Sequence, residues 1–166
     1  MSREGALAVM IGVAVLIIAV LAFAWWRRSR RDADLRAPGG EVPADATVLA
    51  HFSGLYVATT RHEEPLERLA IRGLGFRSRL DLTVTDQGLG LALAGAPPLF
   101  LATGILVAVD QSTVAIDRVV ERDGLVRIVW HVSDDELVDS YLRPQDVSAK
   151  TVVDGIHPLI PAGSDA

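Results

Sequence analysis

The stretch from Ala6 to Trp26 constrains this chain more than any other part of it, because it contains 21 residues without a single charge. At 1.5 Å per helical residue, such a segment spans roughly 30 Å, the hydrocarbon thickness of a bilayer. Apolar residues occupy every side, so a helix here has no polar face with which to lie on a membrane surface. The sequence therefore predicts a transmembrane helix over residues 6–26, preceded by a short external N-terminus, residues 1–5.

The residues that follow this helix predict its orientation. The anchor residues are Trp25, Trp26, Arg27, Arg28, Arg30 and Arg31. Tryptophan is typical of the membrane–water interface, and arginines accumulate on the cytoplasmic side. In front of the helix the only cation is Arg3, whose charge Glu4 cancels. The pattern predicts a single-pass protein of the plasma (inner) membrane, with its N-terminus outside and its C-terminal domain in the cytoplasm.

A cleaved secretory signal is the alternative interpretation of this stretch. Ala22-Phe23-Ala24 resembles a signal-peptidase cleavage site. The apolar core is longer than that of a signal peptide, however, and the arginines just beyond Trp25 retain a segment in the membrane. These features favour a retained anchor.

Composition excludes several functions for the rest of the chain. The sequence has no cysteine, which excludes disulfides, thiolate metal sites and cysteine nucleophiles. Past Ala37 there are 10 basic and 18 acidic residues, a net charge of −8. A domain with this charge is a poor partner for the phosphates of nucleic acid.

Residues 27–46 have the composition of a linker. The arginines come first, and Pro38, Gly39, Gly40 and Pro43 follow with few apolar residues between them. We therefore expect the folded domain to begin near Thr47 and to end near His157, followed by a disordered tail over residues 158–166.

Period-two patterns in residues 47–157 predict a mainly β domain of seven or eight short strands. Leu80, Leu82 and Val84 alternate with polar residues, and the turn at residues 86–88 leads into a returning strand. Residues 122–124 (Arg-Asp-Gly) indicate a hairpin, and 133–136 a further turn. Consecutive hairpins favour antiparallel pairing, and Trp130 shares its strand face with apolar neighbours, which predicts that it lies in the core.

Two helices are expected in this domain. Residues 61–73 contain Glu63, Glu64 and Pro65 at the expected N-terminus and Gly73 at the expected C-terminus. A second helix is predicted from about Gln145 to Ile156, capped by Asp146 or Ser148. The predicted fold class is mainly β with one N-terminal transmembrane helix, an antiparallel barrel or sandwich closed at one end by the C-terminal helix.

Several segments resemble a family of small actinobacterial membrane proteins that carry one N-terminal helix and a bacterial pleckstrin-homology-like (PH-like) domain. These segments are GLYVATT, ERLAIRGLGFRSR, the glycine-containing hairpin, GLVRIVW and the Arg143-Pro144 pair before the last helix. The resemblance covers nearly the whole chain and implies a PH-like fold over residues 47–157. Family members are sometimes labelled as transporter or export proteins. Glu64-Pro65 departs from the family pattern at the start of the expected short helix.

The sequence contains no catalytic, cofactor-binding or metal-binding motif. Its histidines are scattered, without paired-ligand spacing: His51, His62, His131 and His157. No nucleophile elbow, phosphate-binding loop or kinase signature occurs. The acidic run at residues 63–64 is interpreted as the solvated start of the expected helix, and the run at 134–136 as a surface turn. We therefore expect a protein that is not an enzyme and that binds no cofactor or metal.

Arg72, Arg77 and Arg79 form the one cluster with a candidate ligand. Eukaryotic PH domains hold phosphoinositide phosphates with basic residues on their first strands, and Arg77-Ser78-Arg79 after Arg72 imitates that pattern. Guanidinium groups on one strand face could clamp a phosphate. Against this, the glutamates at residues 63, 64 and 67 could neutralise the cluster through ion pairs, which is the default expectation.

The favoured function is a membrane-tethered binding or scaffold module that recruits an unidentified protein partner at the inner leaflet. The first alternative is binding of anionic lipid head groups through the Arg72–Arg79 patch. The second is an accessory subunit of a membrane transport or export complex.

Overall fold

The computed structural model describes residues 3–31, 35–69, 71, 73–115, 118–119 and 124–161. The chain divides into two compact units, residues 1–34 and residues 35–166.

The first unit contains helix α1 (Arg3–Arg31), which includes the whole segment expected to span a membrane. From Val9 to Arg27 its mean hydropathy is 2.6, and none of this window is buried against protein. Its large apolar side chains are 48–73% exposed. In a water-soluble protein such a surface would be unfavourable, because each exposed apolar side chain forgoes about 1.5–3 kcal/mol of burial. In length and composition, α1 is a helix that could cross a bilayer.

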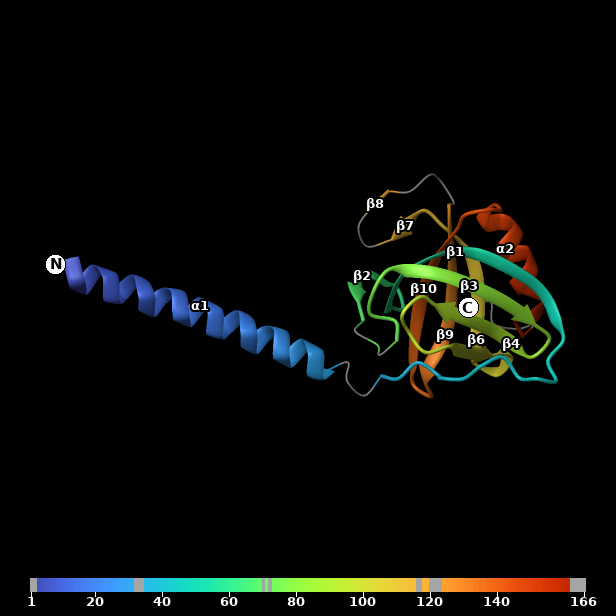
Figure 1. Ribbon diagram of the computed structural model, residues 1–166, viewed down its shortest axis with the longest axis horizontal. Helices are drawn as coiled ribbons and strands as arrows, with labels where there is room; N and C mark the ends of the chain where they lie inside the picture. The colour runs from blue at the N-terminus through green and yellow to red at the C-terminus, as the bar shows by residue number, and fades with distance from the viewer. Residues whose placement is uncertain are drawn as a thin grey trace. The chain divides into compact units, whose positions relative to one another are not determined.

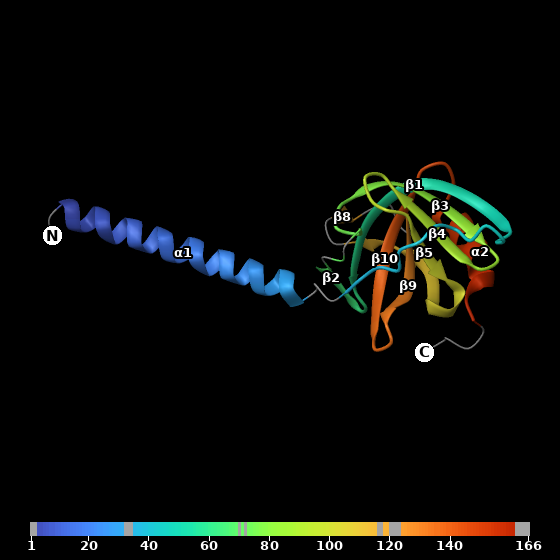
Figure 2. The ribbon, with the colours of Figure 1, turned by 60° about the horizontal axis from the view of Figure 1, so that its bottom comes forward.

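The second unit is built on one antiparallel sheet that curves around a core (Figures 1 and 2). The strands are β1 (Val48–Arg61), β2 (Glu64–Arg68), β3 (Ser78–Thr85), β4 (Gly88–Leu93), β5 (Leu99–Ala102), β6 (Leu106–Ser112), β7 (Val114–Ala115), β8 (Arg118–Val119), β9 (Leu125–Ser133) and β10 (Glu136–Pro144). The main sheet has the order β5-β4-β3-β1-β10-β9-β6, and β2 pairs with β1. The remaining two strands, β7 and β8, pair with each other.

Helix α2 (Ala149–Ile156) packs against the inner face of this sheet. Its Ala149, Val152 and Ile156 are buried in the same cluster as the inward residues of the strands. Ser148 caps the helix by accepting a hydrogen bond from Thr151 N, as one of the two predicted caps. The mainly β fold class with an apolar N-terminal helix and a C-terminal helix is confirmed. Trp130 is fully buried, as its strand pattern predicted.

The chain after α2 continues further into the core than predicted. A 3-10 turn, η2 (His157–Leu159), follows the helix directly, and Leu159 is only 9% exposed. Part of the tail expected to be disordered therefore packs against the domain. Residues 162–166 lie outside the described part of the chain.

The helix predicted over residues 61–73 is wrong, because β2 and a loop occupy this segment. His62 and Glu63 form a tight turn in which Glu63 has a positive φ of 62°, and β2 then pairs back onto the end of β1. Leu66, expected to face inward, is 75% exposed. Local charges and Pro65 imitate a helix start, but pairing with β1 satisfies the backbone instead. Proline is tolerated here because no other strand of the main sheet pairs with β2.

The hairpin predicted at residues 122–124 falls mostly outside the part of the chain that the structure describes. The strand after it, β9, lies between β10 and β6 in the main sheet. Arg122 and Asp123 themselves lie outside the described residues. The predicted turns at residues 86–88 and 133–136 do join paired strands, β3 to β4 and β9 to β10.

The segment predicted to be a linker contains two kinds of structure. Its first residues continue α1 to Arg31, whereas residues 35–46 pack against the β domain. Gly39 bridges Leu99 on β5, Gly40 N donates to Pro98 O, and Phe100 N donates to Pro38 O. These contacts cover the β5 edge, which would otherwise expose unpaired backbone groups. The prolines and glycines that predicted a linker therefore belong to a segment that covers the edge of the sheet.

A β-bulge in β1 reverses which residues face the core. The pairing of β1 with β10 shifts between Tyr56 and Ala58, which leaves Val57 as the extra residue. In a regular strand Tyr56 and Thr59, three residues apart, would point to opposite faces. The bulge allows both to point inward. This local irregularity brings the Tyr56 hydroxyl within 2.9 Å of Thr59 Oγ1.

Candidate functional site

The loop between β2 and β3 is anchored in the core at several points. Leu69, Ile71 and Leu74 are each at most 2% exposed. Leu69 N donates a hydrogen bond to Thr59 O, and the Tyr56 hydroxyl lies 2.8 Å from Leu74 O. This loop is therefore held by both its side chains and its backbone.

Tyr56 makes this anchor through a chain of buried hydroxyls. Its oxygen also lies 2.9 Å from Thr59 Oγ1, which lies 2.7 Å from Ser140 Oγ, and Trp130 Nε1 donates to Ser140 Oγ at 2.9 Å. A phenol has one proton and the Leu74 carbonyl can only accept, so the Tyr56 proton goes to Leu74 O and Tyr56 accepts from Thr59. Burial raises the pKa of Tyr56 to about 12. We call Trp130, Ser140, Thr59 and Tyr56 the hydroxyl relay.

An exposed aromatic residue follows the anchored part of the loop. Phe76 is 87% exposed, although it lies only two residues after the buried Leu74. Arg77 and Arg79 follow it and are also exposed, whereas Leu80 on β3 is buried in the core. We call Phe76, Arg77 and Arg79 the Phe76 surface. Arg72, the third predicted arginine, lies outside the described residues.

The ion pairs expected to neutralise this surface do not form among the described residues. Glu67 lies 3.7 Å from Arg61, and none of Glu63, Glu64 and Glu67 pairs with Arg77 or Arg79. Arg61 pairs with Glu136 as well. The acidic residues near this loop are therefore committed to other groups or remain on the surface, and the guanidinium groups of Arg77 and Arg79 face solvent.

A shallow hollow lies beside the Phe76 surface. It has a volume of about 370 Å³ and is bordered by the two loops that contain Gly73, Phe76, Arg77, Gly95 and Pro97. This volume lies within the range of small-ligand sites. Gly73 and Gly95 have φ values of 92° and 82°, so both loops depend on conformations that glycine adopts easily.

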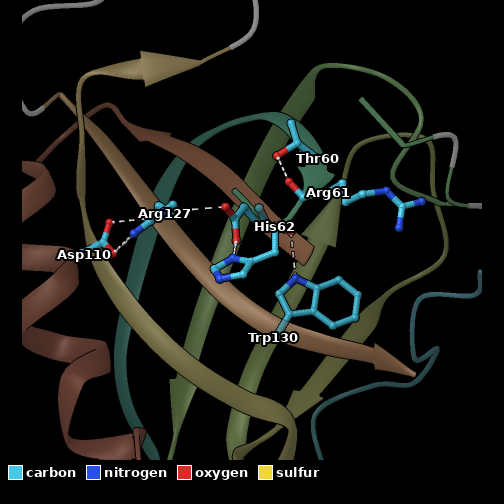
Figure 3. A network of polar contacts seen from close by, with 8 residues as sticks. Thr60, Arg61, His62, Asp110, Arg127 and Trp130 are labelled. Carbon is cyan, nitrogen blue, oxygen red and sulfur yellow. Dashed lines mark hydrogen bonds and ion pairs between the residues drawn. The ribbon is translucent and has the colours of Figure 1, made fainter. Parts of the chain in front are cut away.

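A second polar cluster lies on the outer face of the sheet, and the sequence reasoning missed it. Asp139 on β10 is an acidic residue that is only 1% exposed. His62 Nδ1 lies 2.7 Å from Asp139 Oδ1, and Arg127 Nη1 lies 3.6 Å from Asp139 Oδ2. Arg127 also binds both carboxylate oxygens of Asp110, at 2.6–3.2 Å (Figure 3). We call these four residues the Asp139 cluster.

The Asp139 cluster is best explained as structural. The hydrogen bonds from Arg127 to Asp110 raise the pKa of Arg127 above its usual value, so the guanidinium stays charged between two carboxylates. An aspartate–histidine pair can orient a catalytic base, but a base also needs a nucleophile or substrate within reach. No group of three or more metal-ligating side chains occurs in the part of the chain that the structure describes. The sequence signal for this cluster was the presence of Arg127 and Asp139 inside otherwise apolar strands.

The predicted anchor residues lie at the C-terminal part of α1. Trp25, Trp26 and Arg27 are exposed, and the rings of Phe23 and Trp26 have centroids 6.0 Å apart. The side chains of Arg28, Arg30 and Arg31 lie outside the described residues, although their backbone belongs to α1.

The β unit of this chain is similar to a known sequence family. A family model described as bacterial PH domain-like matches residues 35–155, which is 121 of the 166 residues. The match begins with the edge segment and ends within α2, so it covers nearly all of the β unit. No curated protein matches the chain.

Proposed function

We propose that this chain, which belongs to the bacterial PH domain-like family, is a membrane-tethered binding module that recruits a protein partner. Domains of this family are typically binding modules without catalysis. Helix α1 would anchor the protein in the inner membrane, and the β domain would meet its partner in the cytoplasm. An accessory role in a transport or export complex would be one case of such recruitment.

The observation that carries the proposal is the Phe76 surface. An aromatic side chain 87% exposed to water gains free energy when a partner covers it. Phenylalanine and arginine are both enriched in the buried centres of protein interfaces. The loop that presents Phe76 is anchored by Leu69, Leu74 and the Tyr56 hydroxyl, so a partner would not have to order it.

The orientation of the anchor supports a cytoplasmic partner. The tryptophans at the end of α1 and the arginines after them are the features that place a chain end on the cytoplasmic side. A reporter fused after Ala166 that is active only when exported should therefore remain inactive. Activity of that reporter would contradict the orientation, and neutralising the four arginines should loosen it.

A second candidate function is binding of anionic lipid head groups by Arg77 and Arg79. The specific observation in its favour is that neither guanidinium forms an ion pair among the described residues. Two free guanidinium groups close in sequence suit a phosphate. The net charge of −8 past Ala37 opposes an approach to an anionic leaflet, so we rank this candidate second.

The two candidates are separated by one set of variants of the full chain. Phe76→Ala and the double variant Arg77→Ala with Arg79→Ala should each lose a partner that cross-links to the wild type in detergent-solubilised membranes. Leu49→Ala is the matched control, because Leu49 is 56% exposed on another part of the domain. Lipid binding instead predicts that amide exchange of residues 73–79 slows in nanodiscs when phosphatidylglycerol replaces phosphatidylcholine. Equal cross-linking in wild type and Phe76→Ala would contradict the proposed surface.

A further inference from the structure

A row of three side chains crosses the outer face of the sheet next to the Phe76 surface. Leu55 on β1 pairs directly with Arg79 on β3 and, on its other side, with Arg143 on β10. Residues directly opposite in antiparallel strands project from the same face. Because neighbouring strands are about 4.8 Å apart, the two arginine Cα atoms lie roughly 10 Å apart. We call Arg79, Leu55 and Arg143 the arginine row.

Both ends of the arginine row are available for a partner. Arg79 and Arg143 are exposed, and Leu55 between them is half-buried. Neither arginine forms a salt bridge among the described residues, whereas Arg61 and Arg127 of the same sheet both do. The row thus combines two free guanidinium groups with an apolar centre, in a domain whose overall charge is negative.

The row is narrow, and this limits which partner it fits. Asp81 lies two residues further along β3 on the same face, is exposed, and accepts a hydrogen bond from Ser53 Oγ at 3.4 Å. A flat anionic leaflet laid on this face would meet Asp81 as well as the arginines. An extended peptide, about as wide as a strand, can contact the row and leave Asp81 in water.

We propose that the arginine row is a docking site for an acidic segment of a protein partner, with carboxylates about 10 Å apart that bind Arg79 and Arg143. This inference rests on the proposed protein-recruiting function and adds the chemical class of the partner and the contribution of Arg143. Carboxylates form strong bidentate hydrogen bonds with guanidinium groups, and an apolar residue between them would cover Leu55.

The test uses the full chain in detergent micelles and a labelled ten-residue peptide that alternates glutamate and alanine. Its fluorescence anisotropy is measured at low salt with wild type, Arg79→Glu, Arg143→Glu and Lys150→Glu. All three variants change the net charge equally, but Lys150 is on α2, away from the row. We expect Arg79→Glu and Arg143→Glu each to weaken binding by roughly tenfold or more, and Lys150→Glu by less than twofold. The affinity of a peptide that alternates lysine and alanine should not fall in Arg79→Glu or Arg143→Glu.

Two outcomes would overturn the inference. If Arg143→Glu behaves like Lys150→Glu, Arg143 does not belong to the site, even if Phe76 and Arg79 still recruit a partner. The second outcome is that neither the wild type nor any variant binds the acidic peptide. If phosphatidylglycerol nanodiscs then slow amide exchange at residues 79 and 143 relative to phosphatidylcholine nanodiscs, the ligand is the leaflet. Failure of the proposed function is detected separately, because it depends on cross-linking of Phe76→Ala.

Discussion

Ser140 and Asp139 are neighbours on β10, yet they belong to polar networks of opposite kinds. Ser140 faces inward and joins the hydroxyl relay, in which every group is neutral. Asp139 faces outward and joins a cluster of carboxylates, a guanidinium and a histidine. Both residues are at most 2% exposed. One sheet thus buries polar groups in two ways, with neutral groups on its inner face and with charged groups on its outer face.

The difference lies in how completely each network satisfies its members. In the relay, each proton has one acceptor, from the Trp130 indole to the Leu74 carbonyl. In the Asp139 cluster, Oδ2 of Asp139 is buried without a hydrogen bond, and Arg127 divides its charge between two carboxylates. Burying a neutral polar group has a small desolvation cost, which one hydrogen bond can offset. Burying a charged group costs much more, and only a nearby ion of opposite charge offsets that cost. We expect the two networks to respond differently to substitution.

The largest loss of stability should come from substitution of Trp130 in the hydroxyl relay. Trp130→Ala should destabilise the domain by roughly 3–5 kcal/mol, because it removes a fully buried aromatic side chain and leaves Ser140 without its donor. Urea unfolding of the full chain in detergent measures this loss. Trp130→Phe is the control, since it keeps most of the apolar volume and should cost much less. A loss below about 1 kcal/mol for the alanine variant would contradict the burial of the indole.

In the Asp139 cluster, removing the cation should destabilise the domain more than removing the anion. Arg127→Met should cost about 3 kcal/mol, because it leaves the carboxylate of Asp139 buried with only His62 beside it. Asp139→Asn should cost less, about 1 kcal/mol, because it removes the buried charge itself. The same unfolding experiment compares the two variants. Equal losses would indicate that Asp139 does not depend on Arg127 for its burial.

High pH should affect the relay through Tyr56. The pKa of Tyr56 is raised by burial to about 12, whereas an unfolded tyrosine ionises near pH 10. The unfolded chain therefore releases this proton first, so stability is complete below pH 10 and falls as the pH rises to about 12, by about 2–3 kcal/mol. Burial also raises the pKa of Tyr141, so wild type is compared with Tyr56→Phe. An identical pH dependence in both proteins would contradict the assignment to Tyr56.

The smallest loss of stability should come from breaking a solvent-exposed ion pair. Lys150 Nζ and Asp154 Oδ2 are 2.7 Å apart on α2, but their side chains are 69% and 61% exposed. Lys150→Ala should cost only about 0.3–0.5 kcal/mol, and salt should reduce that cost further. Thermal unfolding at two salt concentrations measures it. A cost as large as that of Arg127→Met would mean that burial does not explain the sensitivity of the Asp139 cluster.

Those features of the fold that depend on neighbouring residues were predictable from the sequence. The turn at residues 86–88, the turn at 133–136 and the Ser148 cap each depend on a few consecutive residues, and all three occur. The expected helix over residues 61–73 failed because its local signals compete with pairing to β1, a contact that the sequence pattern does not contain.

The candidate site was only partly predictable for the same reason. Arg77 and Arg79 were found because they are close together in sequence, but Phe76 was not among the predicted site residues. Arg143 was missed because it comes beside Arg79 only when β1 lies between β3 and β10. Among the described residues, Glu67 on β2 lies beside Arg61, and neither Arg77 nor Arg79 forms an ion pair.

By itself, the sequence determined that the chain has an apolar helix long enough to cross a bilayer and a mainly β domain with Trp130 in its core. Both properties follow from composition and period along a continuous stretch, which local physics decides. Only the tertiary structure decided that residues 35–46 cover a sheet edge and that a bulge at Val57 aligns Tyr56 with Thr59. It also decided that arginines 64 positions apart share one face. These features depend on strand register, which is set by contacts between distant segments.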